Sequence, residues 1–323
     1  MRLGNIFRSA VAAAAVLMLA APSVRAADTV TVGTVGSASA NLWPVLIGID
    51  KGFFAGQDVK VDIVYVQSSA QMIQQLTSGS LDITMSTGLV DPIRAIEKGA
   101  PIAIVRFESQ SPPYALVAKP EIKALKDLRG KTISLGGPKD ITRIYVERML
   151  APSGIKPGEF DMVYAGATSA RAQALLGGAV DAAILLPPFN FQAVDRGFNE
   201  LGLAVDFTPE LPFSGTVANL PWAKTHQALL ARVLAAHAKA VAWFEDDGNR
   251  AEAVKMMVRM SGLKPDEVEK AYDFFRKGHF FEPTGQVSRK KLGALIDALV
   301  GLGDIPRIEL DRLVLPGVTR LTD

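Results

Sequence analysis

The chain has 323 residues, of which 49% are hydrophobic and 21% are charged, and it contains no cysteine. This composition is typical of a globular protein, and the lack of cysteine excludes disulfide bonds and thiolate chemistry. A chain of this length forms one large domain or two medium ones.

The first 26 residues have the pattern of a secretory signal peptide. Arg2 and Arg8 precede an apolar run at 9–21, and Val24 and Ala26 occupy the −3 and −1 positions of a cleavage site. The run is too short to cross a bilayer, although an uncleaved N-terminal anchor is the alternative. Three of the 35 basic residues and none of the 33 acidic ones lie here, so the remaining chain carries −1. We expect cleavage after Ala26, a periplasmic protein and no nucleic-acid partner.

In the rest of the chain, one sequence pattern occurs twice, 99 residues apart. Residues 61–83 align without a gap to 160–182, with identities at Asp62/Asp161, Val64/Val163, Tyr65/Tyr164, Gln74/Gln173, Leu76/Leu175, Gly79/Gly178 and Asp82/Asp181. Each copy predicts a strand, a glycine turn, a helix, a second strand, a helix that ends near Gly79 or Gly178, and a third strand. Alternating strands and helices indicate βαβ units in largely parallel sheets, and the period is too long for a solenoid. Asp82 and Asp181 are predicted to be structural residues of the helix–strand joint.

Two proline-containing segments, 109–119 and 207–220, interrupt this pattern and predict crossings between two α/β lobes. One lobe is expected to combine 27–111 with 208–323, and the other to comprise 112–207. The C-terminal part predicts several helices, one with Pro265 near its start and one with Ser288 as its N-cap.

The order and spacing of several segments resemble one known family. These segments are KGFF (51–54), VDIVYVQSSAQMIQQLTSGSLDITMS (61–86), IEKGAPIAIV (96–105), IKALKDLRGKTISLGG (122–137) and LLGGAVDAAILLPPF (175–189). They resemble the substrate-binding proteins of ABC importers for nitrate, sulfonate, taurine and thiamine-pyrimidine precursors, which include the NMT1/THI5-like proteins. The resemblance covers essentially the whole chain after residue 26. It implies a type II periplasmic-binding fold whose lobes hinge shut over a small molecule, an ABC permease at the inner membrane as partner, a monomer and no cofactor.

Five loops after strand ends are expected to face the cleft, because ligands of open α/β sheets bind beyond the carboxyl ends of the strands. The loop at 136–142 precedes a helix whose N-terminus favours a negatively charged ligand group. Capping or core packing is the structural alternative for the polar and aromatic candidates. Arg106 is expected near the hinge, where it pairs with an anionic ligand or with Glu108. The ligand-binding candidates are Ser37, Asn41, Trp43, Ser86, Thr87, Gly137, Asp140, Thr142, Pro188, Phe189 and Ser214.

No catalytic or metal-binding motif is visible, and the three histidines lie together in the C-terminal part. We therefore expect a binding protein without catalytic residues or a metal. Trp43 and Phe189 favour a small organic ligand, such as a sulfonate, a carboxylate or a pyrimidine-like molecule. Two alternatives stay open: a pyrimidine- or menaquinone-pathway enzyme on the same fold, and a solute-sensing partner of a membrane receptor kinase.

Overall fold

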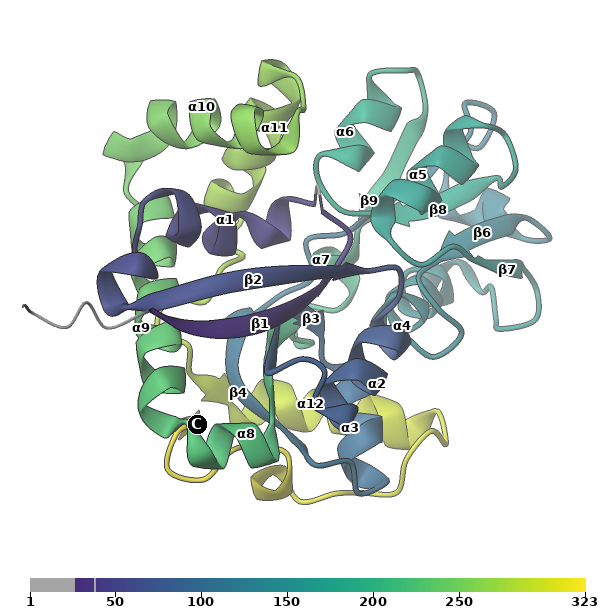
Figure 1. Ribbon diagram of the computed structural model, residues 1–323. Helices are drawn as coiled ribbons and strands as arrows, with labels where there is room; N and C mark the ends of the chain where they lie inside the picture. The colour runs from purple at the N-terminus through teal and green to yellow at the C-terminus, as the bar shows by residue number, and fades with distance from the viewer. Residues whose placement is uncertain (1–26, 38) are drawn as a thin grey trace, which may run out of the picture.

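The computed structural model describes residues 27–37 and 39–323, so the expected signal peptide lies outside the described residues. Two five-stranded sheets with helices on both faces lie side by side as two lobes (Figure 1). The first sheet contains β1 (Asp28–Val35), β2 (Val59–Val66), β3 (Ile83–Gly88), β4 (Ile102–Ser109) and β10 (Ser214–Asn219). The second sheet contains β5 (Ala115–Ala118), β6 (Thr132–Leu135), β7 (Asp161–Tyr164), β8 (Ala182–Leu185) and β9 (Asn199–Leu203). This confirms the expected α/β fold class.

The two sheets have the same topology. Their strand orders are β2-β1-β3-β10-β4 and β7-β6-β8-β5-β9. In each sheet the first three strands are parallel, as expected from βαβ units. The fourth strand, β10 or β5, is antiparallel to both of its neighbours, because it enters directly from the other lobe. The sheets are therefore mixed where the sequence predicted largely parallel ones.

The repeated joint between helix and strand is structural in both copies. Helix α2 (Ser69–Ser78) ends at Gly79, which has φ 80°, and Gly178 follows helix α5 (Thr168–Leu176) with φ 78°. The Asp82 carboxylate accepts the Thr31 N–H at 2.8 Å, and the Asp181 carboxylate accepts the Thr132 N–H at 3.0 Å. Each acid thus ties the joint to the neighbouring strand, which confirms the structural role predicted for it.

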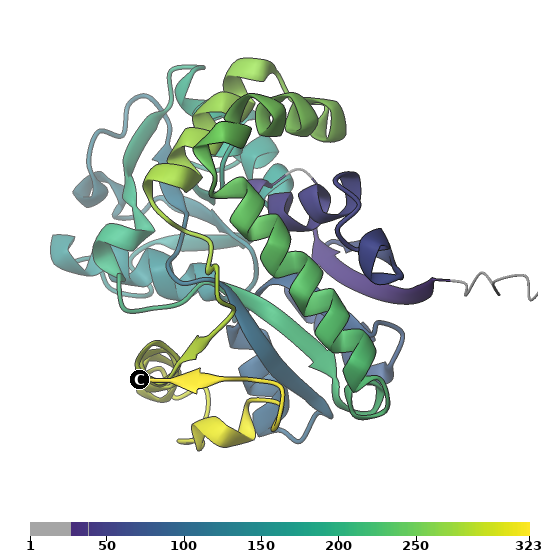
Figure 2. The ribbon, with the colours of Figure 1, turned by 90° about the vertical axis from the view of Figure 1, so that its left-hand side faces the viewer.

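Helices cover both faces of the first sheet. One face packs against α2, α3 (Val90–Glu97) and α12 (Arg289–Gly301), and the other against α1 (Trp43–Asp50), α8 (Leu220–Thr225) and α9 (Gln227–Phe244). Figure 2 looks onto α9, which lies across this second face. Successive side chains of a strand point to opposite faces of its sheet. In β4, Ile104 belongs to the hydrophobic cluster with α2 and α3, while Val105 belongs to the cluster with α9.

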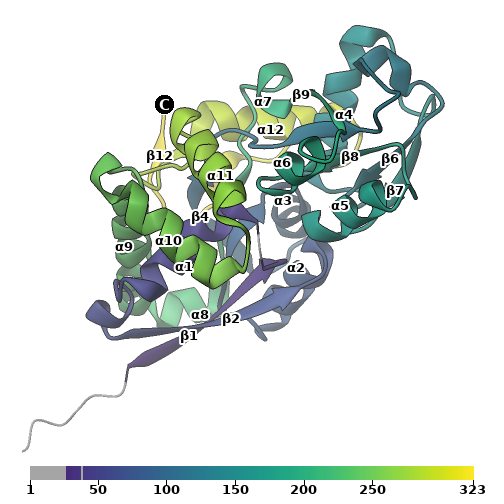
Figure 3. The same ribbon diagram turned by 90° about the horizontal axis from the view of Figure 1, so that it is seen from above.

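The second sheet is covered in the same way. Helices α4 (Ile141–Leu150) and α7 (Ala204–Phe207) pack on one face, and α5 and α6 (Phe189–Val194) pack on the other. Helices α10 (Arg250–Ser261) and α11 (Pro265–Lys277) belong to the cluster around α1, and α11 lies beside α6 of the second lobe (Figure 3). Short strands β11 (Val287–Ser288) and β12 (Leu321–Thr322) complete the C-terminal part, where Ser288 caps α12 as predicted.

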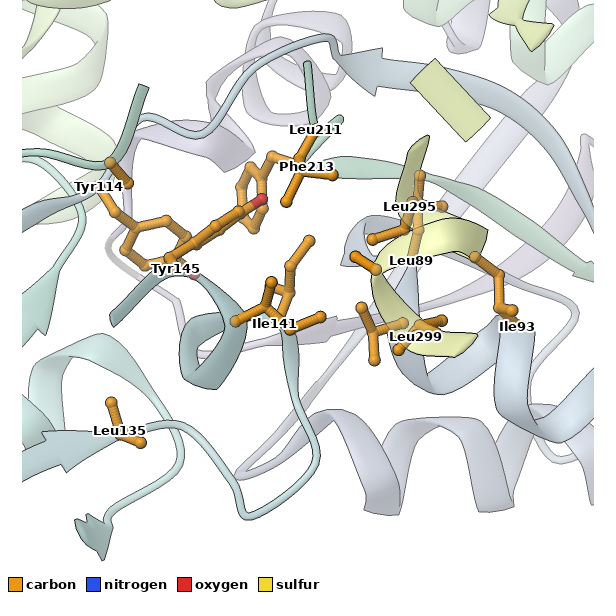
Figure 4. Close-up of a cluster of buried hydrophobic side chains, with 14 of the residues drawn as sticks. Leu89, Ile93, Tyr114, Leu135, Ile141, Tyr145, Leu211, Phe213, Leu295 and Leu299 are labelled. Carbon is orange, nitrogen blue, oxygen red and sulfur yellow. The ribbon is translucent and has the colours of Figure 1, made fainter. Parts of the chain in front are cut away.

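Within residues 27–37 and 39–323 the chain crosses between the sheets twice, at 110–114 and at 208–213. Tyr114 ends the first crossing and Phe213 ends the second, and their rings meet edge to face at a centroid distance of 5.1 Å. The Tyr145 ring lies 5.8 Å from the Tyr114 ring, and its hydroxyl donates to the Pro212 carbonyl at 3.2 Å. Figure 4 shows these three rings together, with Ile141 beside them. One hydrophobic cluster therefore continues from lobe to lobe behind the crossings.

Candidate functional site

A cavity of about 60 Å³ lies between the two lobes. It opens at the carboxyl ends of strands from both sheets, at Val35 of β1, Ser86 of β3, Gly136 after β6 and Leu186 after β8. About 10–15 Å³ of cavity volume is enough for one water molecule. This cavity therefore admits several waters or part of a small solute. The side chains that line it and carry polar atoms are Ser39, Asn41, Ser68, Ser69, Ser86, Asp91, Tyr114, Asp140, Thr168 and Arg171.

A wider groove of about 580 Å³ adjoins the cavity. The two spaces share lining residues on loops of both lobes, namely Ser68, Ser69, Asp91, Gly136, Asp140 and Gly166. Gly137, Lys139, Arg94 and Tyr164 line the groove but not the cavity. The cavity therefore has a route to solvent between the lobes.

A buried hydrogen-bond network shapes the wall formed by the first lobe. The Ser86 N–H donates to the Glu108 carboxylate at 2.6 Å, and the Ser86 hydroxyl donates to the Asn41 carbonyl at 2.8 Å. Thr216 donates to the other oxygen of Glu108. Burial raises the pKa of Glu108, while Thr216, Arg106 and Ser86 oppose the rise. Asn41 itself is 7% exposed, and its Oδ1 has no hydrogen-bond partner among the described residues.

The Asp140 carboxylate caps the N-terminus of helix α4, which is the positive end of the helix dipole. Its carboxylate accepts the Thr142 N–H at 2.9 Å and also the Thr142 hydroxyl, while Thr142 Oγ1 accepts the Gly136 N–H at 3.0 Å. Burial raises the pKa of Asp140, and the nearby Arg171 guanidinium is the largest opposing influence. The sequence predicted an anion-binding helix terminus here, but the protein's own carboxylate already occupies it.

Asp91 is the second carboxylate of the cavity, and the sequence analysis missed it. It lies in the first turn of α3, with its side chain 17% exposed and its Oδ1 3.6 Å from Arg94 Nη1. Burial raises the pKa of Asp91 to about 6, the Ser69 hydroxyl opposes the rise, and smaller contributions come from Asp140, which raises the pKa, and from Arg94, which lowers it. Arg94 also pairs with Asp304, so two acids share that guanidinium.

Arg171 is the basic side chain among the described residues that line the cavity, and the sequence analysis missed it as well. It is 3% exposed, and it donates to the Ile184 carbonyl at 2.7 Å and to Thr168 Oγ1 at 2.6 Å. Its guanidinium lies 5.5 Å from the Tyr114 ring centroid. Burial raises the pKa of Tyr114 to about 12, so the phenol beside Arg171 is neutral.

The sequence itself contained a signal for Arg171. In the 99-residue repeat, Arg171 aligns with Met72, which is completely buried in the first lobe. A charged residue at the core-facing position of a duplicated helix is unusual, because an ionised group is costly to bury without a function or a partner.

Of the predicted site residues, Asn41, Ser86 and Asp140 line the cavity. Thr87 does not, because successive side chains of a strand point to opposite faces, and its hydroxyl meets Met72 Sδ at 3.6 Å behind β3. Thr142 contributes indirectly, through its bonds to Asp140 and Gly136.

The expected aromatic walls are core residues in this structure. Trp43 is 1% exposed and packs against Phe244 and Phe275 at centroid distances of 6.2 and 6.5 Å. Phe189 packs in the cluster of α5 and α6, and the apolar wall comes instead from Leu186 and Phe213.

The remaining candidates also lie away from the cavity. Ser37 is exposed, Pro188 precedes α6, and Ser214 is buried within β10, where it pairs with neighbouring strands. Arg106 donates to the carbonyls of Leu234, at 3.2 Å, and Glu282, at 3.3 Å. Arg106 is therefore a structural cation of the first lobe, with Glu108 and Glu282 as its neighbouring acids.

Direct contacts join the two lobes around the cavity. The Ala40 N–H donates to the Pro187 carbonyl at 3.0 Å. Gly166 lies so close to Gln67 that a Cβ on Gly166 would be 2.3 Å from the Gln67 carbonyl oxygen. On the outer side, Lys270 Nζ of α11 pairs with Asp195 after α6 at 2.7 Å. The lobes are thus held against each other at several points.

Within the described residues, every helix is either too short or too polar to traverse a bilayer. The same part of the chain contains no group of three or more acidic or histidine side chains arranged to hold a metal ion.

Comparisons with known proteins agree with this architecture. The alkanesulfonate-binding protein SsuA from Xanthomonas axonopodis pv. citri, bound to MOPS, superposes with a TM-score of 0.73 at 18% identity, over 91% of this chain and 98% of that chain. The periplasmic nitrate-binding protein NrtA from Synechocystis PCC 6803 gives a TM-score of 0.66 at 14% identity, over 76% and 70%. The desulfurization enzyme DszB gives 0.65 at 13% identity, over 90% and 97%.

These identities establish a common fold. No curated protein matches the sequence. The family model described as NMT1/THI5 like matches residues 39–251, which is more than half of the chain and includes β2 to β10. The chain therefore belongs to the NMT1/THI5-like family.

Proposed function

We propose that this protein is the solute-binding component of an ABC import system in the periplasm, and that it captures a small organic molecule in the cavity between its lobes. The observation that carries the proposal is the cavity itself, which lies at strand ends of two sheets with matching topology. The fold shared with periplasmic sulfonate- and nitrate-binding proteins supports it.

The lobes, 27–111 with 208–323 and 112–207, open and close by a hinge motion at the two crossings. In the part of the chain that the structure describes, only two short connections join the sheets. A closure of this kind lets a membrane permease distinguish the loaded protein from the empty one. The protein acts as a monomer, and an inner-membrane permease is its partner.

The ligand contacts the polar lining from both lobes. Asn41, Ser86 and Asp91 approach it from the first lobe, and Asp140 and Arg171 from the second. A solute that bridges these groups stabilises the closed arrangement, because it binds that arrangement more tightly than the open one. The Ser86 hydroxyl lies 3.1 Å from the Glu108 carboxylate but is also held in the wall by its bond to the Asn41 carbonyl, and we expect binding without turnover.

A thermal-shift screen tests the proposal. Purified protein is melted with alkanesulfonates, nitrate, aromatic carboxylates and amino-bearing solutes, and a compound present at 100 times its Kd should raise the unfolding free energy by roughly 2.7 kcal/mol. Asn41→Ala should reduce the shift, while Ser37→Ala, at an exposed position outside the cavity, should not. Turnover of any compound, or no stabilisation by any class, contradicts the proposal.

A further inference from the structure

The charges that face the cavity do not balance. Among the described residues, two carboxylates line it, Asp91 from the first lobe and Asp140 from the second, and one guanidinium, Arg171, lines it beside Asp140. Arg94 stands outside the cavity and is shared between Asp91 and Asp304. With both carboxylates ionised, the cavity wall carries an excess of one negative charge.

The N-termini of α3 and α4 could hold an anionic ligand group, but carboxylates of the protein already lie there. The Asp140 carboxylate caps α4 and lies directly over Gly136, and Asp91 occupies the first turn of α3. A ligand anion placed at either helix would meet a carboxylate at short range in a poorly solvated space.

Two residues that line the cavity carry a buried polar atom without a partner among the described residues: Arg171 Nε lacks an acceptor, and Asn41 Oδ1 lacks a donor. Asn41 is more than nine-tenths buried and lines the cavity, and its Oδ1 accepts no hydrogen bond from the described residues. Its Nδ2 is directed toward the Ser86 carbonyl, at 3.5 Å, which leaves the oxygen as the available atom. A buried acceptor without a donor costs free energy, so a donor from a ligand has a place here.

We propose that the ligand carries a protonated nitrogen, such as a primary ammonium or an amidinium group, which lies between Asp91 and Asp140 and donates to Asn41 Oδ1. This inference rests on the proposed function and specifies its substrate class. The ligand nitrogen neutralises the excess charge and joins acids from opposite lobes, so its binding and lobe closure reinforce each other.

Matched pairs of probes test the inference by isothermal titration at neutral pH. The pairs are ethanesulfonate and taurine, propionate and β-alanine, and 4-methylbenzoate and 4-(aminomethyl)benzoate, and the members of each pair differ only by an amine. The amine-bearing member of at least one pair should bind at least tenfold more tightly than its partner. Equal or tighter binding of the amine-free members overturns the inference alone, whereas binding of neither member in any pair contradicts the proposed function as well.

Two variants locate the ammonium subsite. Asp91→Asn and Asp140→Asn should each weaken binding of the amine-bearing probe by about 10- to 100-fold, because each loses one charge-assisted hydrogen bond. Asparagine at 140 still caps α4, and at 91 it keeps the size of the side chain, so both variants should fold, which melting in the absence of probe checks. Asp62→Asn, at an exposed acid of β2, is the control and should leave binding unchanged. Unchanged affinity in both cavity variants overturns the inference.

Discussion

Ser86 is a residue of the cavity wall with a constrained backbone. Its φ is 56°, in the left-handed region that residues other than glycine seldom adopt. Glu108 accepts its N–H and the Asn41 carbonyl accepts its hydroxyl, so buried partners on two elements hold this conformation. The strain lies beside the cavity, as is common for residues that shape a ligand site.

We expect Glu108→Ala to lower the free energy of unfolding by about 3 kcal/mol or more, because it leaves Arg106 as a buried charge with one neighbouring acid fewer and Ser86 and Thr216 as donors without this acceptor. Urea unfolding measures the change. Glu121→Ala, at an exposed position, is the matched control and should cost less than about 0.5 kcal/mol. Equal costs for the two variants would show that the Glu108 network contributes nothing.

Asp91 makes stability depend on pH. Because burial raises its pKa from 3.8 to about 6, the folded state holds the proton more tightly than the unfolded state. Its contribution therefore favours folding at low pH and is lost as the pH rises through about 6. Asp140 and Arg94 face Asp91 from α4 and α3, and the carboxylate of Asp140 acts in the same direction.

The difference in unfolding free energy between the wild type and Asp91→Asn should consequently fall by about 1 kcal/mol from pH 5 to pH 7 in ligand-free protein. Urea unfolding at the two pH values provides the measurement. Asp62→Asn, which removes an exposed acid, should show no such change. If the difference between the wild type and Asp91→Asn is the same at both pH values, burial does not raise the pKa of Asp91.

At the scale of elements, the loops that follow strands set how closely the lobes approach. The loop after β7 contains Gly166, with φ 70°, and a Cβ there would meet the Gln67 carbonyl oxygen of the loop after β2 at 2.3 Å. Real Cβ atoms do not approach an oxygen so closely, so glycine at this position permits the close contact between lobes.

Gly166→Ala should hold the lobes apart and weaken ligand binding by at least tenfold. Gly178→Ala is the control, because Gly178 lies in the same lobe with φ 78° but has open space around its Cβ position. Both variants should lose a similar stability, about 1 kcal/mol, through backbone strain. Titration of a ligand identified by thermal shift separates them, and equal affinities would mean that this contact has no part in closure.

The duplicated elements could be predicted from the sequence because their signals are local. Strand runs, the glycines after α2 and α5, and the acids at 82 and 181 each determine structure within a few residues. The fold class followed from their order. The antiparallel strands β5 and β10 did not, because their direction depends on which lobe the chain has just left.

The site was harder to predict from the sequence, because the direction in which a side chain points depends on tertiary packing. Ser86 and Thr87 are neighbours with similar chemistry, but only Ser86 faces the cavity. Trp43 follows a predicted cleft loop, yet α9 and α11 supply rings that draw it into the core. Arg171 was missed because the apolar residues around it recur at helical spacing, and this pattern predicts only a helix that packs on the core.

At the scale of the whole molecule, the cavity lies between two lobes that touch each other at several points. The α11–α6 contact and the Ala40–Pro187 hydrogen bond lie outside the cavity, while Gly36 and Ala167 approach each other on loops of opposite lobes. The cavity adjoins a groove that Asp91 and Asp140 also line, so a solute enters either along this groove or through the proposed opening of the lobes. If opening is required, a covalent link between the lobes should slow uptake.

The chain offers a clean way to make that link, since it has no cysteine of its own. A Cβ on Gly36 would lie 3.4 Å from the Ala167 Cβ, close to the 3.5–4.5 Å span of disulfides, so Gly36→Cys with Ala167→Cys should oxidise to one interlobe bond. Gly36 has φ 71°, so its replacement should cost about 1 kcal/mol of stability, which the single variant also carries. The oxidised protein should take up ligand at least tenfold more slowly than its reduced form, as measured by stopped-flow fluorescence. Each single variant, treated with the same oxidant, should take up ligand at its reduced rate. If the cross-linked protein binds as fast as the reduced one, solute reaches the cavity through the existing groove, and the lobes need not move apart to admit it.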